Sequence, residues 1–262
     1  MKSITRIGAV AAALLAAATT QAQLPGALTF CVGVDNLPMS EASGPSGVEV
    51  ELARALAKQL GREARFEWLD PHRDFAEKAV LDGRCDAALG AIVEPGGMAG
   101  AQPVTGVTLT EPYYSAGYLL IRRSGARPVG TLEGLRGTRI ALEGESLVTY
   151  TLRQQGHAVH VLREYGDVVS ALADGRAEYG YLWGPLAAWL LRERSDVVVE
   201  KDFQPTELWS FAMAVREADT ELRQALNRGI REMVQGGSLT GIFAKYQVPY
   251  FAPAPKPSEP GG

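Results

Sequence analysis

The sequence has few of the residues on which most enzyme mechanisms depend. Of its 262 residues, three are histidine and two are cysteine. His157 and His160 stand three apart at the start of an expected strand, where they would point to opposite faces, so we expect no shared metal. A G-x-S-x-G nucleophile elbow and a phosphate-binding P-loop are both missing. We therefore expect no catalytic residue, no metal and no cofactor, in a protein that is not an enzyme.

The chain also lacks a basic excess and a long apolar run. Its net charge is -4 at pH 7, which gives no support to a nucleic-acid partner. The apolar residues 7–18 are too few to cross a bilayer. Lys2 and Arg6 before them, and a small-x-small site at residues 20–22, indicate a signal peptide over residues 1–22. We expect an exported, periplasmic protein that does not span a membrane.

The two cysteines, Cys31 and Cys85, favour one disulfide. An isolated pair in an oxidising compartment most simply oxidises. The bond would close a long loop, which the chain-entropy model values at about 4 kcal/mol. Two buried free thiols are the alternative, whereas metal binding by two lone cysteines lacks the usual spacing.

Strand and helix patterns alternate along the chain in two series, separated by an irregular, glycine-rich segment. The first series has strands at 28–34, 65–69 and 86–92, with helices at 48–60 and 75–81. The second has strands at 118–122, 138–142, 159–162 and 179–183, with helices at 147–155, 168–173 and 185–192. A strand at 211–215 and helices at 220–235 and 239–246 follow.

This order predicts two α/β lobes, each built on a parallel sheet with right-handed crossovers. We expect lobe 1 to comprise residues 23–115 and 212–250, and lobe 2 residues 116–211. Two hinge crossovers join them, and a proline-rich, flexible tail covers 251–262. We expect a monomer.

Ligands of open α/β sheets bind beyond the carboxyl ends of the strands. If the two lobes face each other, the stretches that follow their strands line one cleft. The carboxylates and aromatic rings in these stretches suit a cationic or neutral aromatic ligand. The ligand-binding residues that we expect are Asp35, Asn36, Glu94, Tyr113, Tyr114, Glu143, Ser146 and Trp183.

The acidic residues near position 144 allow more than one interpretation. Glu143, Glu145 or Glu94 could act as an acid or base in a closed cleft. Acids before a helix also simply favour its dipole. Backbone N–H groups and Ser146 could instead hold an anion, which two glutamates would oppose.

The aromatic residues are equally open to a structural role. Tyr113 and Tyr114 either line the cleft or pack the hinge after Pro112. Trp183 ends a strand, and Pro185 follows in the first turn of the next helix. The indole either stacks on a ligand or fills the cleft so that none enters.

In its motif order the chain resembles the family 3 periplasmic solute-binding proteins, the two-lobed cleft proteins of amino-acid ABC transporters. The likeness is carried by VDNLP (34–38), VEVELARALAKQL (48–60), LEGLRGTRIALEGES (132–146) and the segment from WSFAMAV to the end helices (209–246). It implies a type II periplasmic-binding-protein fold with two lobes around a cleft. It also implies transport of a small solute without catalysis, with an ABC permease as partner.

Two departures from the family pattern bear on the ligand. The family's amino-acid binders usually carry an arginine in the loop after the third strand and an aspartate after the last strand of the second lobe. Here residues 91–114 contain no arginine, and Trp183 occupies the place of the acid. Glutamate and indole cannot replace a bidentate arginine clamp and a carboxylate for the same ligand. We therefore do not expect a standard α-amino acid.

The chain further resembles one branch, the accessory proteins of quinoprotein alcohol dehydrogenases, exemplified by the methanol-oxidation J proteins. FCVGVDNLPMS (30–40), GRCDAALG (83–90), TEPYYSAGYLLIRR (110–123) and YLWGPLAAW (181–189) carry that likeness. It implies an alternative function, through contacts with a periplasmic quinoprotein (methanol/alcohol) dehydrogenase or its cytochrome c. Further alternatives are a periplasmic dehydratase on the same scaffold and a sensor or structural module.

Overall fold

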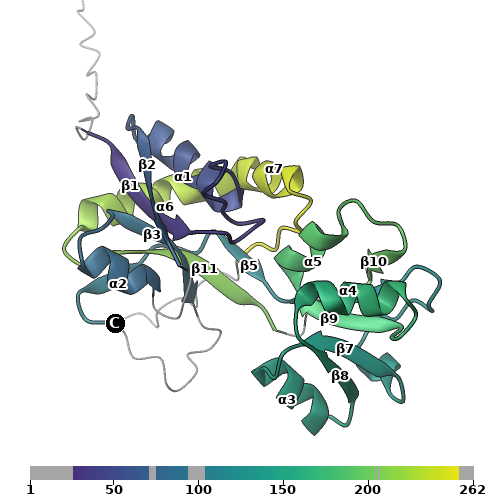
Figure 1. Ribbon diagram of the computed structural model, residues 1–262. Coiled ribbons are helices and arrows are strands. Elements are labelled where there is room, and N and C mark those ends of the chain that lie inside the picture. Colours follow the sequence, from purple (N-terminus) through teal and green to yellow (C-terminus); the bar gives the residue numbers. More distant parts are fainter. Residues whose placement is uncertain (1–25, 71–74, 94–103, 204, 206, 254–262) are drawn as a thin grey trace, which may run out of the picture.

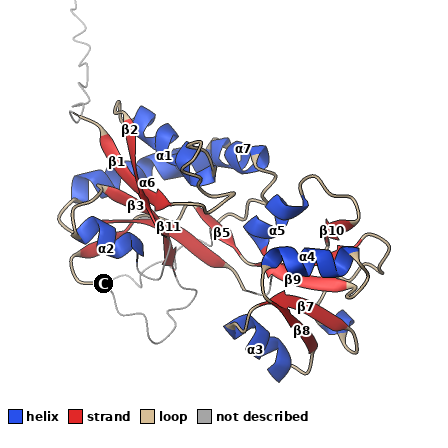
Figure 2. Ribbon diagram, in the orientation of Figure 1, coloured by secondary structure: helices blue, strands red, loops and turns tan. Residues whose placement is uncertain are grey.

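The computed structural model in Figure 1 describes residues 26–70, 75–93, 104–203, 205 and 207–253. Two sheets, each covered by helices, form two lobes joined by extended strands (Figures 1 and 2). The α/β fold class expected from the sequence is confirmed. The expected signal peptide, Glu94 and most of the tail lie outside the described residues.

The first lobe is a six-stranded sheet with the order β2-β1-β3-β11-β4, in which β5 also pairs with β11. Strand β1 pairs parallel with β2 and β3, whereas β11 runs antiparallel to β3. The strands are β1 (Leu28–Gly33), β2 (Ala64–Leu69), β3 (Ala87–Val93), β4 (Val107–Leu109), β5 (Tyr114–Ala116) and β11 (Trp209–Arg216). The helices are α1 (Val48–Gln59), α2 (Phe75–Leu81), α6 (Thr220–Gln235) and α7 (Ser238–Lys245).

The second lobe is a five-stranded sheet with the order β10-β6-β9-β7-β8. Strand β7 pairs parallel with β8 and β9, and β6 runs antiparallel to β9 and β10. The strands are β6 (Tyr118–Arg123), β7 (Arg139–Glu143), β8 (Ala158–Leu162), β9 (Tyr179–Trp183) and β10 (Val197–Val199). The helices are η1 (Glu133–Leu135), α3 (Leu147–Gln154), α4 (Tyr165–Ala173) and α5 (Gly184–Leu191).

The parallel pairing that the sequence predicted holds within β1 to β3 and within β7 to β9. The strands that cross between the lobes run antiparallel to their neighbours, so both sheets are mixed. Three short strands, β4, β5 and β10, were not predicted. Each has three residues and is defined by its longer partner strand rather than by its own pattern.

The disulfide expected from the two cysteines is present between Cys31 and Cys85. It ties β1 to the turn between α2 and β3, two residues before β3 begins, and both cysteines are buried. They pack with alanine and valine side chains of α2, such as Ala79 and Val80. The bond therefore lies in the apolar layer under α2.

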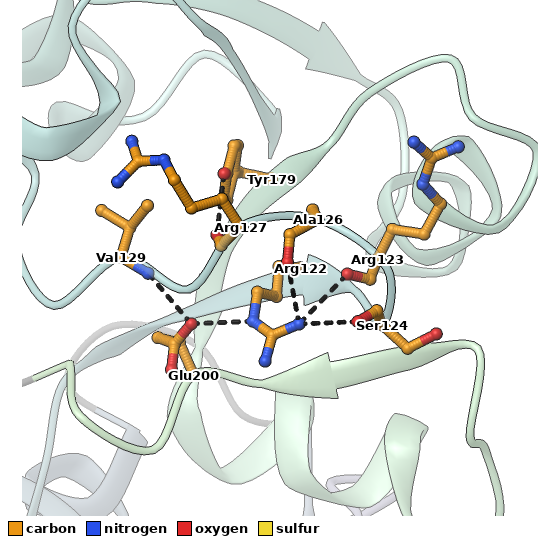
Figure 3. A network of polar contacts seen from close by, with 8 residues as sticks. All are labelled: Arg122, Arg123, Ser124, Ala126, Arg127, Val129, Tyr179 and Glu200. Atoms are coloured by element: carbon orange, nitrogen blue, oxygen red, sulfur yellow. Dashed lines mark hydrogen bonds and ion pairs between the residues drawn. The ribbon is translucent and has the colours of Figure 1, made fainter.

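A buried ion pair organises one end of lobe 2 (Figure 3). Arg122 Nε donates to Glu200 Oε2 at 2.8 Å, and the backbone N–H of Val129 donates to the same oxygen at 3.1 Å. Arg122 Nη1 also donates to the carbonyl of Ser124 at 2.9 Å. Arg122 pairs with Tyr179, the first residue of β9. The network therefore lies at the opposite end of this strand pair from Trp183.

None of the helices in the described part of the chain has the length and apolar character needed to cross a membrane. Within the same residues, no three histidine, cysteine, aspartate or glutamate side chains gather in a way that could hold a metal ion.

Candidate functional site

The two lobes meet where β5 and β6 pass the start of β11. Ala116 pairs with Trp209 in the crossover, and the Gly184 N–H donates to the Gly117 carbonyl at 2.9 Å. A Cβ at Gly117 would lie 2.4 Å from the Glu207 carbonyl oxygen, and one at Gly184 would lie 2.7 Å from the Gly117 oxygen. Glycine is required at both positions because the backbones approach so closely.

Four aromatic residues, Tyr118, Trp183, Trp209 and Phe211, form a cluster at this crossing, which we call the aromatic junction. The Trp183 centroid lies 5.7 Å from that of Tyr118 and 5.9 Å from those of Trp209 and Phe211. All three contacts are edge-on, a geometry that aromatic quadrupoles favour. All four residues remain partly exposed, so the junction is not a closed core.

The aromatic junction continues into the cores of both lobes. On one side Tyr118 stacks on Tyr181, with centroids 5.4 Å apart. On the other side Phe211 stacks on Tyr114 at 4.7 Å. Trp183 itself packs against the buried cluster of lobe 1, although its strand belongs to lobe 2. The indole at the end of β9 therefore connects the two cores.

Glu143 supplies a carboxylate beside the aromatic junction. It is the last residue of β7 and is half-buried. Burial, and then the negative charge of Glu143, raise the pKa of Tyr118. The same two causes raise the pKa of Tyr165 to about 12. The carboxylate thus lies among phenol rings and can face a positive charge.

Ser146, in contrast, is occupied by the helix that it precedes. Its Oγ accepts a hydrogen bond from the Thr149 N–H at 3.2 Å and caps α3. Thr149 Oγ1 donates to the Gly144 carbonyl at 2.8 Å. Glu145 pairs with Arg153, and the hydrogen bond from that guanidinium lowers the pKa of Glu145. Hydrogen bonds within the loop therefore fix its conformation. Of its two glutamates, Glu145 pairs with Arg153 and Glu143 lies beside the aromatic junction.

Asp35 and Asn36 lie on lobe 1 in the loop after β1, and both are exposed. Asp35 has a positive φ of 46°. The Asn36 N–H donates to the Ser40 carbonyl at 2.8 Å, and its own carbonyl accepts from the Met39 N–H at 2.8 Å. This tight turn, which contains a cis Leu37–Pro38 bond, leaves both side chains accessible at the carboxyl end of β1.

Tyr113 and Tyr114 are buried in the core of lobe 1, with 0% and 2% exposure. The Tyr113 hydroxyl donates to Glu49 Oε1 at 2.6 Å and accepts from the Gly90 N–H at 3.1 Å. Of the two roles that the sequence left open, these contacts fit packing beside the hinge. In this conformation neither ring presents a surface to a ligand.

Trp183 and Glu143 therefore both lie next to Tyr118 on lobe 2. Asp35 and Asn36 lie on lobe 1. The sequence missed Tyr118, Trp209 and Phe211. The alternation in W-S-F at 209–211 was a usable signal, because it places the two rings on one face of a strand. The sequence pattern predicts this strand only from residue 211 and so places Trp209 in a loop, whereas β11 begins at Trp209.

The comparisons with known proteins agree with this architecture. Residues 28–249 match the bacterial extracellular solute-binding proteins, family 3. Protein MoxJ of Methylorubrum extorquens is 23% identical over 240 residues, which cover 79% of this chain and 76% of MoxJ.

Solved structures share the fold at low identity. The second substrate binding domain of a putative amino acid ABC transporter from Streptococcus pneumoniae superposes with a TM-score of 0.70 at 20% identity, over 84% of this chain and 100% of that one. An ancestral cationic amino acid solute binding protein gives a TM-score of 0.69 at 21% identity, over 85% and 96% of the two chains. The fold is that of a type II periplasmic binding protein, and the chain belongs to the bacterial extracellular solute-binding proteins of family 3.

Proposed function

We propose that this protein is a non-catalytic periplasmic solute-binding protein that holds a small organic ligand between its lobes. The observation that carries the proposal is Trp183, which stands at the carboxyl end of β9 among three aromatic rings. The family resemblance expects an acid there for the ammonium group of an amino acid. An indole cannot supply that ion pair, so the ligand is not a standard α-amino acid.

The composition of the aromatic junction favours an organic cation or a neutral aromatic molecule. Partly exposed indole and phenol rings attract cations through their faces and stack on flat ligands. Glu143 adds a negative charge next to Tyr118. Trp183 and Glu143 would contact the ligand from lobe 2, and Asp35 and Asn36 from lobe 1 after closure. Ser146 would act by fixing the loop that carries Glu143.

Native mass spectrometry of freshly purified protein tests this function. We expect a retained small molecule, released on denaturation, whose mass and fragmentation identify an organic cation or a neutral aromatic compound. Trp183→Leu should lose it. Trp189→Leu is the matched control, because Trp189 is also half-buried against the lobe 1 core but carries the Arg192 guanidinium 3.7 Å above its ring. A retained α-amino acid would refute the proposal.

The similarity to Protein MoxJ favours a second function, in which the chain is an accessory protein of a periplasmic quinoprotein dehydrogenase. The likeness spans 240 residues. Leu147 and Tyr150, one turn apart on α3, are 68% and 59% exposed and offer an apolar contact surface for a protein partner.

Capture from a periplasmic extract separates the two functions. The accessory role predicts recovery of a quinoprotein dehydrogenase or its cytochrome c, and loss of both with Leu147→Glu/Tyr150→Glu. Gln224→Glu, at an exposed position on α6 of the other lobe, should leave capture unchanged. Recovery of neither protein, together with a retained small molecule, would favour transport through an ABC permease.

A further inference from the structure

Glu49 is a buried carboxyl group in the first turn of α1. The residue is 3% exposed and is surrounded by the apolar core of lobe 1. Its hydrogen-bonding side-chain partner is the hydroxyl of Tyr113, 2.6 Å from Oε1. A buried carboxylate without a cation is costly to ionise, so its presence requires a structural reason.

The Tyr113 hydroxyl also forms a hydrogen bond with the backbone of β3. Its hydroxyl oxygen accepts the Gly90 N–H at 3.1 Å. Gly90 has a positive φ of 83°, and the pairing between β3 and β11 shifts register between Ala212 and Ala214. Such a bulge leaves a backbone N–H outside the ladder and redirects the residues that follow it. Tyr113 satisfies that N–H three residues before the end of β3.

The backbone of Glu49 holds a second segment of lobe 1. Its N–H donates to the Met39 carbonyl at 2.9 Å, and the neighbouring Val48 N–H donates to the Pro38 carbonyl at 3.0 Å. A Cβ at Gly47 would lie 2.3 Å from the Met39 oxygen, so the loop approaches α1 very closely. Glu49 therefore joins the loop after β1 to the bulge of β3.

The surroundings of Glu49 shift its ionisation to near neutral pH. Burial raises the pKa of Glu49 to about 7, and the hydrogen bond from Tyr113 acts in the opposite direction. The titratable groups that face Glu49 are the phenols of Tyr113 and Tyr114. Burial, and then the negative charge of Glu49, raise the pKa of both phenols well above the usual range. The neighbouring charges on α1 and α7 interact with each other instead, since Lys245 and Arg54 both lower the pKa of Glu51.

We propose that Glu49 is a positioning residue whose protonation state sets the strength of the hydrogen bond between Tyr113 and Gly90. An ionised carboxylate draws on the phenol proton and makes the phenol oxygen a better acceptor, because linked hydrogen bonds polarise one another. A protonated Glu49 draws less on that proton, so the Gly90 bond weakens. The carboxyl end of β3 is therefore held most firmly above about pH 7.

The Gly90 amide resonance, followed by ¹H–¹⁵N correlation spectra from pH 5 to 9, tests this inference without any ligand. We expect its proton shift to move downfield with rising pH and to titrate near pH 7. Glu49→Gln should abolish the titration, and so should Tyr113→Phe, which keeps the packing of the ring. Glu51→Gln, a partly buried acid on the same helix that pairs with Lys245 and not with Tyr113, should preserve it.

Two outcomes would overturn the inference. One is a wild-type Gly90 resonance that does not titrate in this range. The other is the same titration in Glu49→Gln, which would assign the effect to another group. Neither outcome depends on whether the protein binds a solute. A failure of this inference would therefore leave the proposed function untouched, and a failure of the proposed function would leave this inference untouched.

Discussion

The indole of Trp183 at the end of β9 lies edge-on to the indole of Trp209 at the start of β11, with ring centroids 5.9 Å apart and planes inclined by 60°. The two residues belong to different sheets, so their contact joins the lobes at the crossover. Aromatic packing thus occupies the position at which the family resemblance implies an acid.

Truncating Trp183 should weaken the connection between the lobes. Trp183→Ala removes three edge-on ring contacts, each worth about 0.5–1.5 kcal/mol beyond the buried area. We expect a loss of about 3 kcal/mol in the free energy of unfolding, at the lower end of the range for a buried tryptophan. Trp183→Phe should cost less than about 1.5 kcal/mol. Urea denaturation followed by far-ultraviolet circular dichroism measures both, and equal losses would contradict the role of ring contacts.

Glu49 should make the protein more stable in mild acid. Its pKa is raised from 4.5 in the unfolded chain to about 7 in the fold. The folded state therefore binds more protons between these values. This contribution is fully present below about pH 4.5 and is lost as pH rises through 7, a change of about 3 kcal/mol at 1.36 kcal/mol per pKa unit.

The difference in unfolding free energy between wild type and Glu49→Gln isolates this contribution. We expect the variant to be the more stable of the two at pH 8, with a difference that shrinks towards pH 5. Parallel stability curves for the two proteins would show that Glu49 ionises normally in the fold. Denaturation at constant ionic strength across this range provides the measurement.

Removing the disulfide should destabilise lobe 1 without changing its fold. The bond joins residues 54 positions apart, for which the chain-entropy model gives about 4 kcal/mol. Both cysteines are buried against alanine and valine, so Cys31→Ala/Cys85→Ala leaves an apolar layer. Guanidinium denaturation should show the loss, and wild type with its disulfide reduced should match the double variant. Identical midpoints for oxidised and reduced wild type would refute the prediction.

Breaking the Arg122–Glu200 pair should affect stability and not the candidate site. Glu200→Ala leaves a largely buried guanidinium without its carboxylate and should cost about 3–5 kcal/mol. Arg122→Met/Glu200→Leu removes both charges and should cost much less. Differential scanning calorimetry compares them. Solute binding should be unchanged in the double variant, because the network lies at the other end of β6 and β9 from Trp183.

The sequence predicted most elements because their patterns are local. Strand β9 and helix α6 have the bounds that were expected, and α1 differs by one residue. The three-residue strands were not predicted, because three residues carry no pattern that distinguishes a strand from a loop. They become strands only by pairing with a longer strand such as β11. The antiparallel direction of β6 and β11 likewise depends on the crossing between lobes.

The candidate site was less predictable because it depends on contacts between distant segments. Trp183 was identified by its position after a strand, yet its partners Trp209 and Phe211 come from the return crossover. Tyr113 looked like a cleft residue, because the sequence does not reveal that Glu49, 64 positions away, holds its hydroxyl in the core. Burial of a polar side chain is visible only once its partner is known.

Titration calorimetry with a panel of small probes tests the central claim most directly. The protein is first unfolded and refolded to remove any retained ligand. Tetramethylammonium, benzylamine, succinate and L-glutamate are then titrated into it separately. We predict saturable binding of an organic cation, weakened about tenfold in Trp183→Leu, which is within the range of a desolvated cation–π contact. Binding of succinate or L-glutamate alone, with equal affinity in wild type and Trp183→Leu, would contradict the account.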